Sequence, residues 1–481
     1  MMLDPHTCYR AMRSHDARFD GRFYVAVRST RIYCRPVCTV RPPKRENCRF
    51  YPSAAAAESA GFRPCLRCRP ELAPGNASVD ATTRLAQAAA SLIEDAALEE
   101  SSLTALARRL GITDRHLRRA FGAEFGVSPV EFAQTQRLLL AKRLLTDTAL
   151  PVTDVAFASG FGSVRRFNAL FRERYRLQPK QLRRHAAAPG GEDALAFELS
   201  YRPPYDWAAV SAFLGARAIA GVEALEDGVY RRTVRLRIER RTHAGWIAVA
   251  PSKKKPALRV TVGASLAKAL PPVLSRVKAL LDLACNPQEV AQALGELGKA
   301  RPGLRVPGAF DGFEVAVRAI LGQQVTVAAA RTVAGRFAAE FGEAVETPFP
   351  TLGVLFPNAE QIATTKPGEI ARLGMPEARA RTVIGLARAV AEGGLVLMPN
   401  ADIEPTLERL RAIPGIGEWT AQYIAMRALA WPDAFPHADY GVMKALGVSD
   451  PKAALAAGEA WRPWRAYAVM HLWHNLSKAK E

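Results

Sequence analysis

The sequence lacks any long apolar run. Its apolar stretches stay well short of the roughly 20 residues that a membrane-spanning helix requires. The segment Met1–His6 has no basic region leading into an apolar core, so no secretory leader is expected. These absences exclude a membrane partner and predict a cytoplasmic protein.

Cysteine is scarce and unevenly placed. There are seven cysteines, and all except Cys285 precede residue 69. Because thiols in the cytoplasm stay reduced, metal binding or thiol reactivity explains such a cluster better than disulfide bonding does. No cysteine follows Cys285, so the C-terminal segment lacks the ligands that an iron–sulfur cluster needs.

Acidic residues are few relative to basic ones. Lys and Arg number 66 against 46 Asp and Glu, which gives a net charge of +20. Such a surplus favours a polyanionic partner, and nucleic acid is the commonest one. The length of 481 residues exceeds what one hydrophobic core supports, so we expect several domains.

Four cysteines form two close pairs, with C-x3-C and C-x2-C spacing. Paired thiols of this kind are typical of a tetrahedral zinc site. We therefore predict one Zn²⁺ bound by Cys34, Cys38, Cys65 and Cys68. The remaining cysteines fit no pair and are expected to be small buried apolar residues. These are Cys8, Cys48 and Cys285.

Three segments around the paired cysteines, Phe23–Cys38, Arg45–Asn47 and Ala60–Pro70, resemble the N-terminal domain of the bacterial adaptive-response (Ada) proteins. In that family the first zinc cysteine accepts a methyl group from a methylphosphotriester in DNA, and this role maps onto Cys34. Zinc keeps the sulfur as a nucleophilic thiolate at neutral pH. The transfer is expected to be stoichiometric, because the thioether is a dead end.

Methylation of Cys34 removes one negative charge from a site that faces phosphates. The resemblance implies a switch from repair to promoter binding, in which nearby arginines then dominate. The alternative is a zinc module that docks on DNA without accepting methyl. The family's other methyltransferase motif, Pro-Cys-His-Arg, is absent, so reversal of O6-alkylguanine is not expected. The arginines expected to attract DNA are Arg31, Arg35, Arg67 and Arg69.

The next region contains an internal repeat. Leu103–Gly111 parallels Val152–Gly160, and each is followed by a segment with apolar residues at helical spacing. Each unit predicts a helix-turn-helix whose second helix can enter the major groove. The pair resembles the AraC-type transcription regulators, with an all-helical scaffold that binds no DNA as the alternative. The candidate DNA contacts are Arg115, Arg118, Arg165, Arg166 and Asn168.

A glycine hairpin, Ile413–Thr420, lies near the C-terminus. We expect helices over residues 405–411 and 420–429 on either side of it. Gly415 and Gly417 let the backbone approach a partner closely, and the second helix offers free N–H groups to a phosphate. Asp439 follows as a lone carboxylate. This pattern resembles the helix-hairpin-helix DNA glycosylases.

The chain from Leu195 to His474 resembles the 3-methyladenine DNA glycosylase II (AlkA) group. The resemblance implies a small antiparallel-sheet domain, then helical domains with the active site in a cleft. It also implies that Asp439 stabilises an oxocarbenium-like sugar or orients water. Asp433 is the nearest rival carboxylate, and a helix N-cap is the structural alternative for Asp439. The matching segments are Arg202–Trp207, Leu283–Pro287, Ala300–Arg305, Arg318–Gln323 and Trp461–Tyr467.

Trp419, Tyr423 and Trp473 are the expected pocket for a flipped base, with core packing as the alternative. Cationic purines such as 3-methyladenine and 7-methylguanine bind electron-rich rings by cation–π attraction. Trp419 stands where related lyases carry a lysine, so the enzyme is expected to be monofunctional and to need no cofactor for base excision. The family also inserts a wedge residue into the duplex, and the wedge position, leucine in the best-known pattern, is Gln324 here. The predicted DNA contacts of this half are Gln323, Gln324, Gly415 and Gly417.

The combined prediction is a multidomain, mainly α protein. Its domains are a zinc-bound α+β domain (1–75), a tandem helix-turn-helix domain (80–185), an antiparallel α+β domain (193–304) and a helix-hairpin-helix glycosylase domain (305–481). We expect a DNA-3-methyladenine glycosylase II joined to a methylphosphotriester-sensing transcriptional activator. The alternative is a regulator whose glycosylase-like half only binds DNA. Expected partners are double-stranded DNA and RNA polymerase, for a monomeric, nucleoid-associated chain.

Overall fold

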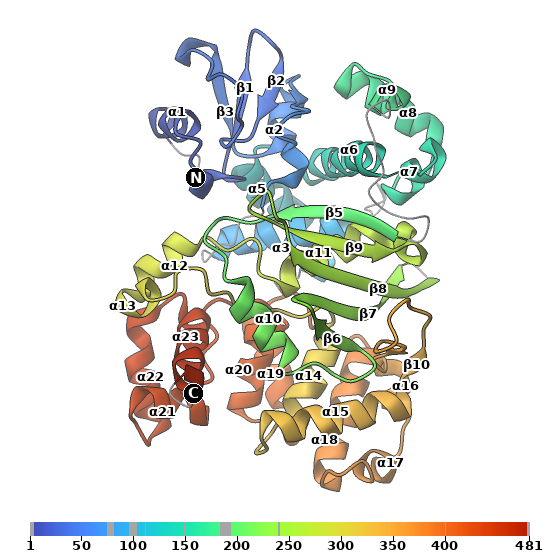
Figure 1. Cartoon of the computed structure of the whole chain (residues 1–481), viewed down its shortest axis with the longest axis vertical. Helices are drawn as coiled ribbons and strands as arrows, with labels where there is room; N and C mark the ends of the chain where they lie inside the picture. The colour runs from blue at the N-terminus through green and yellow to red at the C-terminus, as the bar shows by residue number, and fades with distance from the viewer. Residues whose placement is uncertain are drawn as a thin grey trace.

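A computed structural model describes residues 4–74, 81–95, 103–110, 112–148, 150–182, 194–238, 241–399 and 401–478. Figure 1 shows the N-terminal part above a five-stranded sheet and the C-terminal helices below it. The predicted domain borders at 75–80 and 185–193, and Gly111 of the first repeat, lie outside the described residues.

The first domain is built on a four-stranded sheet in the order β3-β1-β2-β4. β1 pairs antiparallel with β2 and β3, whereas β2 and β4 are parallel. Because β2 ends at Cys34 and β4 leads directly into Cys65, the parallel pair brings the two cysteine pairs together. The elements are α1 (Pro5–Arg13), η1 (Ala17–Phe19), β1 (Tyr24–Val27), β2 (Ile32–Cys34), η2 (Arg45–Asn47), β3 (Cys48–Tyr51), α2 (Ala54–Ser59), β4 (Arg63–Pro64) and η3 (Pro70–Leu72).

Helices make up the described part of the next region. Helices α4 and α5 form the first predicted helix-turn-helix unit, α7 and α8 form the second, and α6 links them. Both second helices begin at a hydroxyl N-cap, Thr113 for α5 and Ser163 for α8, which satisfies a free backbone N–H. The bounds are α3 (Ala81–Asp95), α4 (Leu103–Arg109), α5 (Asp114–Phe125), α6 (Pro129–Asp147), α7 (Val152–Ala158), α8 (Val164–Tyr175) and α9 (Pro179–Leu182).

The C-terminal half starts with an antiparallel sheet in the order β5-β9-β8-β7-β6. Side chains from one face of this sheet pack with residues of α10 and α11 in one core. The elements are β5 (Ala194–Ser200), α10 (Trp207–Gly215), β6 (Glu223–Glu226), β7 (Val229–Ile238), β8 (Arg241–Pro251), β9 (Ala257–Gly263), η6 (Ala264–Ala269), α11 (Leu270–Leu280), α12 (Pro287–Leu294) and α13 (Glu296–Lys299).

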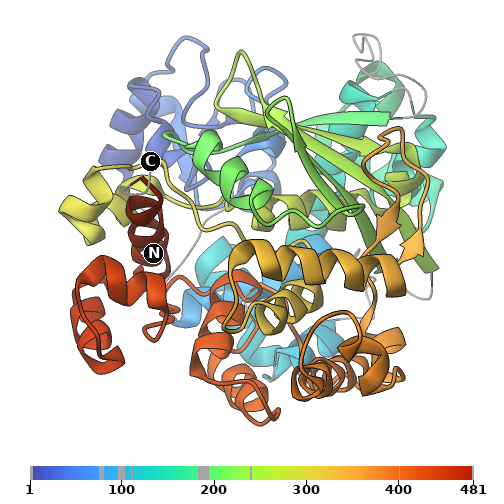
Figure 2. The ribbon, with the colours of Figure 1, turned by 60° about the horizontal axis from the view of Figure 1, so that its bottom comes forward.

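The remaining residues are mainly helical and surround a second large core. The predicted hairpin lies between α19 and α20, close to the expected bounds, and the mainly α, multidomain fold class is confirmed. In Figure 2 the last helix, α23, lies beside α12 and α13. The elements are α14 (Gly312–Leu321), α15 (Val327–Phe341), β10 (Glu343–Ala344), β11 (Val354–Leu355), α16 (Ala359–Ala363), α17 (Pro367–Ala371), α18 (Glu377–Ala391), α19 (Ile403–Arg411), α20 (Glu418–Arg427), α21 (Tyr440–Leu446), α22 (Pro451–Gly458), η7 (Glu459–Trp461) and α23 (Arg465–Lys478).

The second helix-turn-helix unit and the five-stranded sheet share one hydrophobic core. Val155 of α7 and Phe167 of α8 cluster with Phe197 of β5. Arg143 of α6 donates a 2.6 Å hydrogen bond to the backbone carbonyl of Glu198 in β5. The N-terminal and C-terminal halves are therefore packed against each other. Within the described ranges, no helix has the length and apolar character needed to cross a membrane.

Glu58 is a buried carboxylate where the zinc-binding domain meets the helix-turn-helix region. It accepts a 2.9 Å hydrogen bond from the Tyr33 hydroxyl and a 3.3 Å bond from the Thr135 hydroxyl of α6. Arg174 of α8 donates to its backbone carbonyl at 3.3 Å. Burial raises the pKa of Glu58 to about 7.

Replacing Glu58 with Gln is expected to stabilise the chain above neutral pH. A carboxyl whose folded-state pKa is raised contributes stability below its unfolded pKa, and this contribution is lost as the pH rises through the folded value. The rise from 4.5 to about 7 corresponds to ~3 kcal/mol. Thermal unfolding at about pH 5 and about pH 8 measures the effect, with the exposed Glu46→Gln as control. An unchanged Tm at the higher pH contradicts the prediction.

Candidate zinc site and glycosylase cleft

The four paired cysteines converge at one point. Their sulfur atoms all lie within 4.8 Å of one another. Four thiolates gathered this closely are the usual donor set of a tetrahedral zinc site, so the residues fit one Zn²⁺. The backbone N–H of Arg35 lies 3.4 Å from Cys68 Sγ, a contact that favours the thiolate form. Three of the ligands are buried, whereas Cys68 is partly exposed.

The unpaired cysteines lie in the hydrophobic interior, as predicted. Cys8 and Cys48 belong to one core cluster of the first domain. Burial raises the pKa of Cys8 to about 11 and that of Cys285 to about 12. These thiols therefore stay protonated at neutral pH and are poor nucleophiles.

The arginines around the zinc site fall into two pairs. Arg31 and Arg67 are exposed, in line with the expectation that they attract DNA. Arg35 is buried and bonded to Asp20, and Arg69 is bonded to Glu71 and Asp147. Intramolecular carboxylates thus hold the guanidinium groups of Arg35 and Arg69, and the attraction of DNA by these four arginines after methylation stays a prediction.

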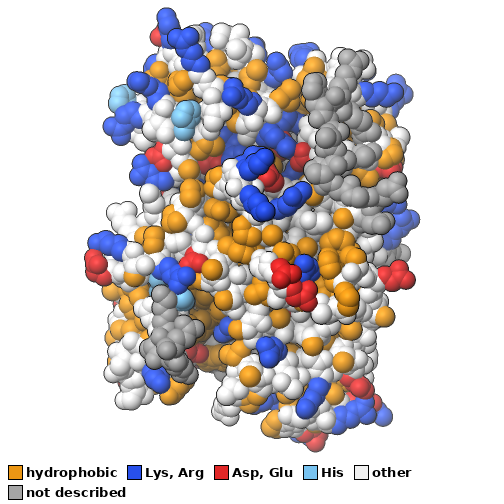
Figure 3. Space-filling model, viewed as in Figure 1, with side chains coloured by type: hydrophobic (Ala, Val, Ile, Leu, Met, Phe, Trp, Pro, Cys, Tyr) orange, Lys and Arg blue, Asp and Glu red, His pale blue; other side chains and the backbone are white. Residues whose placement is uncertain are grey.

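The predicted helix-turn-helix contacts lie on one helix of each unit. Arg115 and Arg118 are exposed on α5, Arg165 and Arg166 are exposed on α8, and Asn168 is half-buried. The opposite side of each helix is buried, through Leu117 and Phe121 on α5 and through Phe167 and Phe171 on α8. Figure 3 shows Lys and Arg side chains outnumbering Asp and Glu over the N-terminal part of the face it displays.

Asp439 lies at the start of α21, where three N–H groups hold its carboxylate. The indole Nε1 of Trp419 donates to Oδ2 at 2.9 Å, and the indole Nε1 of Trp473 donates to Oδ1 at 2.8 Å. Oδ1 also accepts from the backbone N–H of Val442 at 3.0 Å. The N-cap alternative is thus true as well, but it uses only one of the three bonds. The two tryptophans come from α20 and α23.

Aromatic rings line the space beside this carboxylate. Trp419 and Tyr423 are stacked with ring centroids 5.5 Å apart, and Trp473 lies 6.2 Å from Tyr423. Arg427 donates to the Tyr423 hydroxyl at 2.8 Å. Burial would raise the pKa of Tyr423, but Arg427 and Arg217 outweigh that effect and lower it. The three predicted pocket residues are therefore brought together with Asp439.

The hairpin between α19 and α20 is closely packed on one side and open on the other. Gly415 has φ of +91°, and a Cβ there would lie 2.1 Å from Thr382 Oγ1, so only glycine fits. A Cβ on Gly417 would meet nothing within 4 Å. Gln323 Nε2 donates to the Gly415 carbonyl and to Thr420 Oγ1, both at 2.9 Å. Gln324 is exposed at the adjoining turn, in the left-handed conformation.

Asp433, the rival carboxylate, is held in ion pairs. Its oxygens lie 2.6 Å from Arg462 and 2.7 Å from Arg465. Its side chain is 11% exposed. The two ion pairs tie the segment before α21 to the segment before α23 and to the first residue of α23.

Models of four domain families match consecutive segments of the chain. They are the metal binding domain of Ada (residues 7–71), a helix-turn-helix domain (106–185), the AlkA N-terminal domain (196–311) and the HhH-GPD superfamily base excision DNA repair protein (317–461). The chain is 40% identical to the "Probable bifunctional transcriptional activator/DNA repair enzyme AlkA" of Mycobacterium tuberculosis, over 98% of this chain and 97% of the relative. The chain belongs to this bifunctional activator and repair family.

Two further relatives match the halves separately. The DNA-3-methyladenine glycosylase 2 of Escherichia coli is 39% identical over 58% of this chain and 97% of its own length. The bifunctional transcriptional activator/DNA repair enzyme Ada of Escherichia coli is 38% identical over 28% of this chain and 36% of its own length. Membership in the family makes the chain a DNA glycosylase joined to a zinc-binding, DNA-binding regulator, with one Zn²⁺ at the four cysteines.

Sequence reasoning missed three residues beside the predicted site residues. Phe213 of α10 stacks on Trp473 with ring centroids 6.4 Å apart and planes 16° apart. Tyr440, directly after Asp439, is 74% exposed, and Val325, directly after Gln324, is 42% exposed. An exposed large apolar side chain cannot be recognised from sequence, and Phe213 lies far from Trp473 along the chain. Only their position beside identified residues draws attention to them.

Proposed function

We propose that the C-terminal half hydrolyses the N-glycosidic bond of alkylated purines in double-stranded DNA, of the 3-methyladenine and 7-methylguanine type, with Asp439 as the catalytic carboxylate. The observation that carries this proposal is the pair of indole N–H bonds to Asp439. Breaking the bond leaves a cation on the sugar, which a fixed carboxylate stabilises. Because the bonds leave little freedom of rotation, the charge is oriented before substrate binds.

The same tryptophans serve the base. Trp419 and Trp473 use their N–H edges on the carboxylate, and each stacks one ring face on a neighbour, Tyr423 or Phe213, so the proposed contact with the base is through the opposite faces. A cationic alkylated purine is attracted to such faces by roughly 2 kcal/mol when water is excluded. An unmodified purine lacks the charge and gains less. The pocket therefore selects for alkylation through charge.

DNA is held by the hairpin and by the turn after α14. Gly415 and Gly417 present the backbone before α20, where a phosphate oxygen can accept N–H bonds. Gln323 bonds the turn to this hairpin, so a phosphate bound at the hairpin also fixes the position of the turn on the DNA. Gln324 and Val325 together fill the gap left by the flipped base, because the amide supplies hydrogen bonds and the valine supplies the apolar contact that leucine gives in other members. Trp419 at the lyase lysine position supports a monofunctional enzyme that leaves an abasic site.

The N-terminal half senses methylphosphotriesters in DNA. The Cys34 thiolate attacks the methyl carbon, the carbon–oxygen bond breaks, and the phosphodiester leaves as an anion while sulfur becomes a thioether. The helix-turn-helix pair then reads promoter DNA through α5 and α8 and engages RNA polymerase. We propose that the chain does this as a monomer associated with the nucleoid.

Asp439→Asn is expected to lower release of 3-methyladenine from methylated duplex DNA by at least ~100-fold, because the charge opposite the sugar cation is lost. Released base is measured by chromatography, and strand nicking is assayed on the same DNA. Asp450→Asn is the matched control, because Asp450 is an exposed carboxylate that caps the next helix, α22. No release from the unmodified chain would leave the alternative, a regulator whose glycosylase-like half only binds DNA. Equal release from both chains would move the catalytic role to another carboxylate.

Trp473→Phe and Trp419→Phe each keep a ring but remove one N–H donor to Asp439. A hydrogen bond to a charged group contributes about 1.5–3 kcal/mol, so we expect release to fall by ~10- to 100-fold. Single-turnover kinetics measure the loss, and Trp461→Phe is the matched control. If both variants keep full activity, the indole bonds do not orient the catalytic carboxylate.

Val325→Ser is expected to slow excision from duplex DNA by ~5-fold, because about 1 kcal/mol of apolar contact is lost. Val396→Ser changes the same residue type at another exposed position and serves as control. Single-turnover rates on one alkylated duplex compare the three proteins. An unchanged rate for Val325→Ser would return the wedge role to Gln324 alone.

Exposure to DNA carrying methylphosphotriesters is expected to add one methyl group to Cys34 and to no other cysteine. Peptide mass spectrometry of the zinc-loaded chain measures it, with Cys34→Ser as the control that accepts none. A chain that binds such DNA without gaining mass would support a zinc module that only docks.

A further inference from the structure

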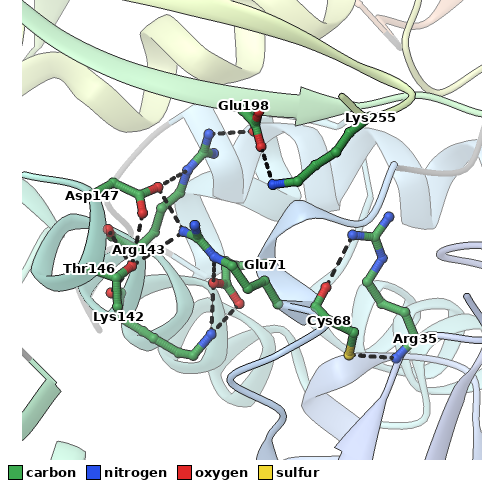
Figure 4. Close-up of polar contacts among 10 residues, drawn as sticks. Arg35, Cys68, Glu71, Lys142, Arg143, Thr146, Asp147, Glu198 and Lys255 are labelled. Atoms are coloured by element: carbon green, nitrogen blue, oxygen red, sulfur yellow. Dashed lines mark hydrogen bonds and ion pairs between the residues drawn. The ribbon is translucent and has the colours of Figure 1, made fainter. Parts of the chain in front are cut away.

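Two ion pairs tie the segment after the last zinc ligand to helix α6 (Figure 4). Arg69 directly follows Cys68 and lies 2.7 Å from Asp147 and 3.0 Å from Glu71. Lys142 lies 2.6 Å from the other oxygen of Glu71. Burial alone would lower the pKa of Arg69, but Asp147 and Glu71 outweigh that effect and raise it. Lys142 and Glu71 are almost fully buried, with side chains 1% and 3% exposed, whereas Arg69 and Asp147 are partly buried, at 24% and 15%.

The first cysteine pair is tied to the same helix by another route. Tyr33, directly before Cys34, donates to Glu58, and Glu58 accepts from Thr135 of α6. Arg35, directly after Cys34, donates to the backbone carbonyl of Cys68 at 3.3 Å. Both ligand pairs of the zinc site are thus bonded to each other and, through their chain neighbours, to α6.

Helix α6 is also joined to elements on both sides of it that the proposed function connects with the zinc site. It links the two helix-turn-helix units, and its Leu138 and Leu144 share a core with Phe167 and Phe171 of α8. Its Arg143 is 4% exposed at the side chain and donates to β5 of the C-terminal half. A displacement of α6 therefore reaches a recognition helix and the sheet on which the glycosylase half is built.

We propose that helix α6 transmits the methylation state of Cys34 to the helix-turn-helix pair, and that the Arg69–Asp147 ion pair is the coupling contact. This inference rests on the proposed sensor function. Methylation removes one negative charge close to Arg35 and Arg69, and charges at a buried junction are weakly screened. Arg69 is then held more strongly by Asp147 and Glu71, which draws the end of α6 toward the zinc site. The effect is a coupling free energy between two sites, and it is reciprocal.

Asp147 is the residue to change. It is the last residue of α6, its side chain is 15% exposed, and Arg69 keeps Glu71 as partner when Asp147 loses its charge. Asp147→Asn therefore removes the coupling contact, while Arg143, 3.8 Å from Asp147, keeps its hydrogen bond to the carbonyl of Glu198. Asp154→Asn is the matched control, because Asp154 is an exposed carboxylate on the next helix, α7.

The test uses the full, zinc-loaded chain, methylated with methyl iodide so that the thioether forms without DNA. Peptide mass spectrometry establishes that Cys34 carries the methyl group. Fluorescence anisotropy then gives Kd before and after methylation, for a duplex selected from a random-sequence library by binding to the methylated chain. We expect methylation to tighten binding of the unmodified chain and of Asp154→Asn by about tenfold or more. In Asp147→Asn the ratio of the two Kd values is expected to fall toward one.

Hydrogen exchange over residues 129–147 is measured on the same samples. Methylation is expected to increase protection of α6 in the unmodified chain and not in Asp147→Asn. Arg69→Lys, which keeps the charge but loses the fork that spans Asp147 and Glu71, is expected to behave like Asp147→Asn. The proposal is overturned if Asp147→Asn keeps the full Kd ratio, or if the unmodified chain shows none. Because methyl iodide supplies the methyl group, failure of transfer from a phosphotriester is a separate result and affects only the proposed sensor function.

Discussion

The ion pair between Lys142 and Glu71 is the constraint on which the arrangement of the N-terminal half depends. Lys142 is 1% exposed and Glu71 is 3% exposed at the side chain. Separating two such charges costs several kcal/mol, because each would remain in a medium that does not solvate it. The zinc-binding domain and helix α6 are therefore held in one orientation. That orientation sets where Cys34 lies relative to the recognition helices.

The same helix explains how two functions share one chain. Helix α6 packs on α7 and α9, shares a hydrophobic core with α8 and bonds to β5, so the regulatory half and the sheet meet in one continuous interface. The core shared by Val155, Phe167 and Phe197 continues across the junction. In this chain the two halves meet through a packed interface.

At the other end of the molecule, the side chains around Asp439 each make two kinds of contact. Each of the two indoles that hold Asp439 has one edge on the carboxylate and one face on an aromatic neighbour. In the proposed mechanism, orientation of the reacting charge and recognition of the base thus depend on the same side chains. A substitution at either tryptophan is therefore expected to affect both the orientation and the recognition. Asp433 makes no comparable contact with an indole, because its oxygens are paired with Arg462 and Arg465.

The sequence by itself determined the zinc ligands, the helix-turn-helix repeat, the hairpin and the family. These features depend on the spacing of a few residues along the chain, and that spacing can be recognised without knowledge of the fold. Only the tertiary structure decided which charges face solvent and which segments meet. Arg35 and Arg69 look like free cations in sequence, but carboxylates from distant segments pair with them. Phe213 joins the cleft from another domain. Such contacts form because the closure of long loops brings remote residues together, and no local pattern records that closure.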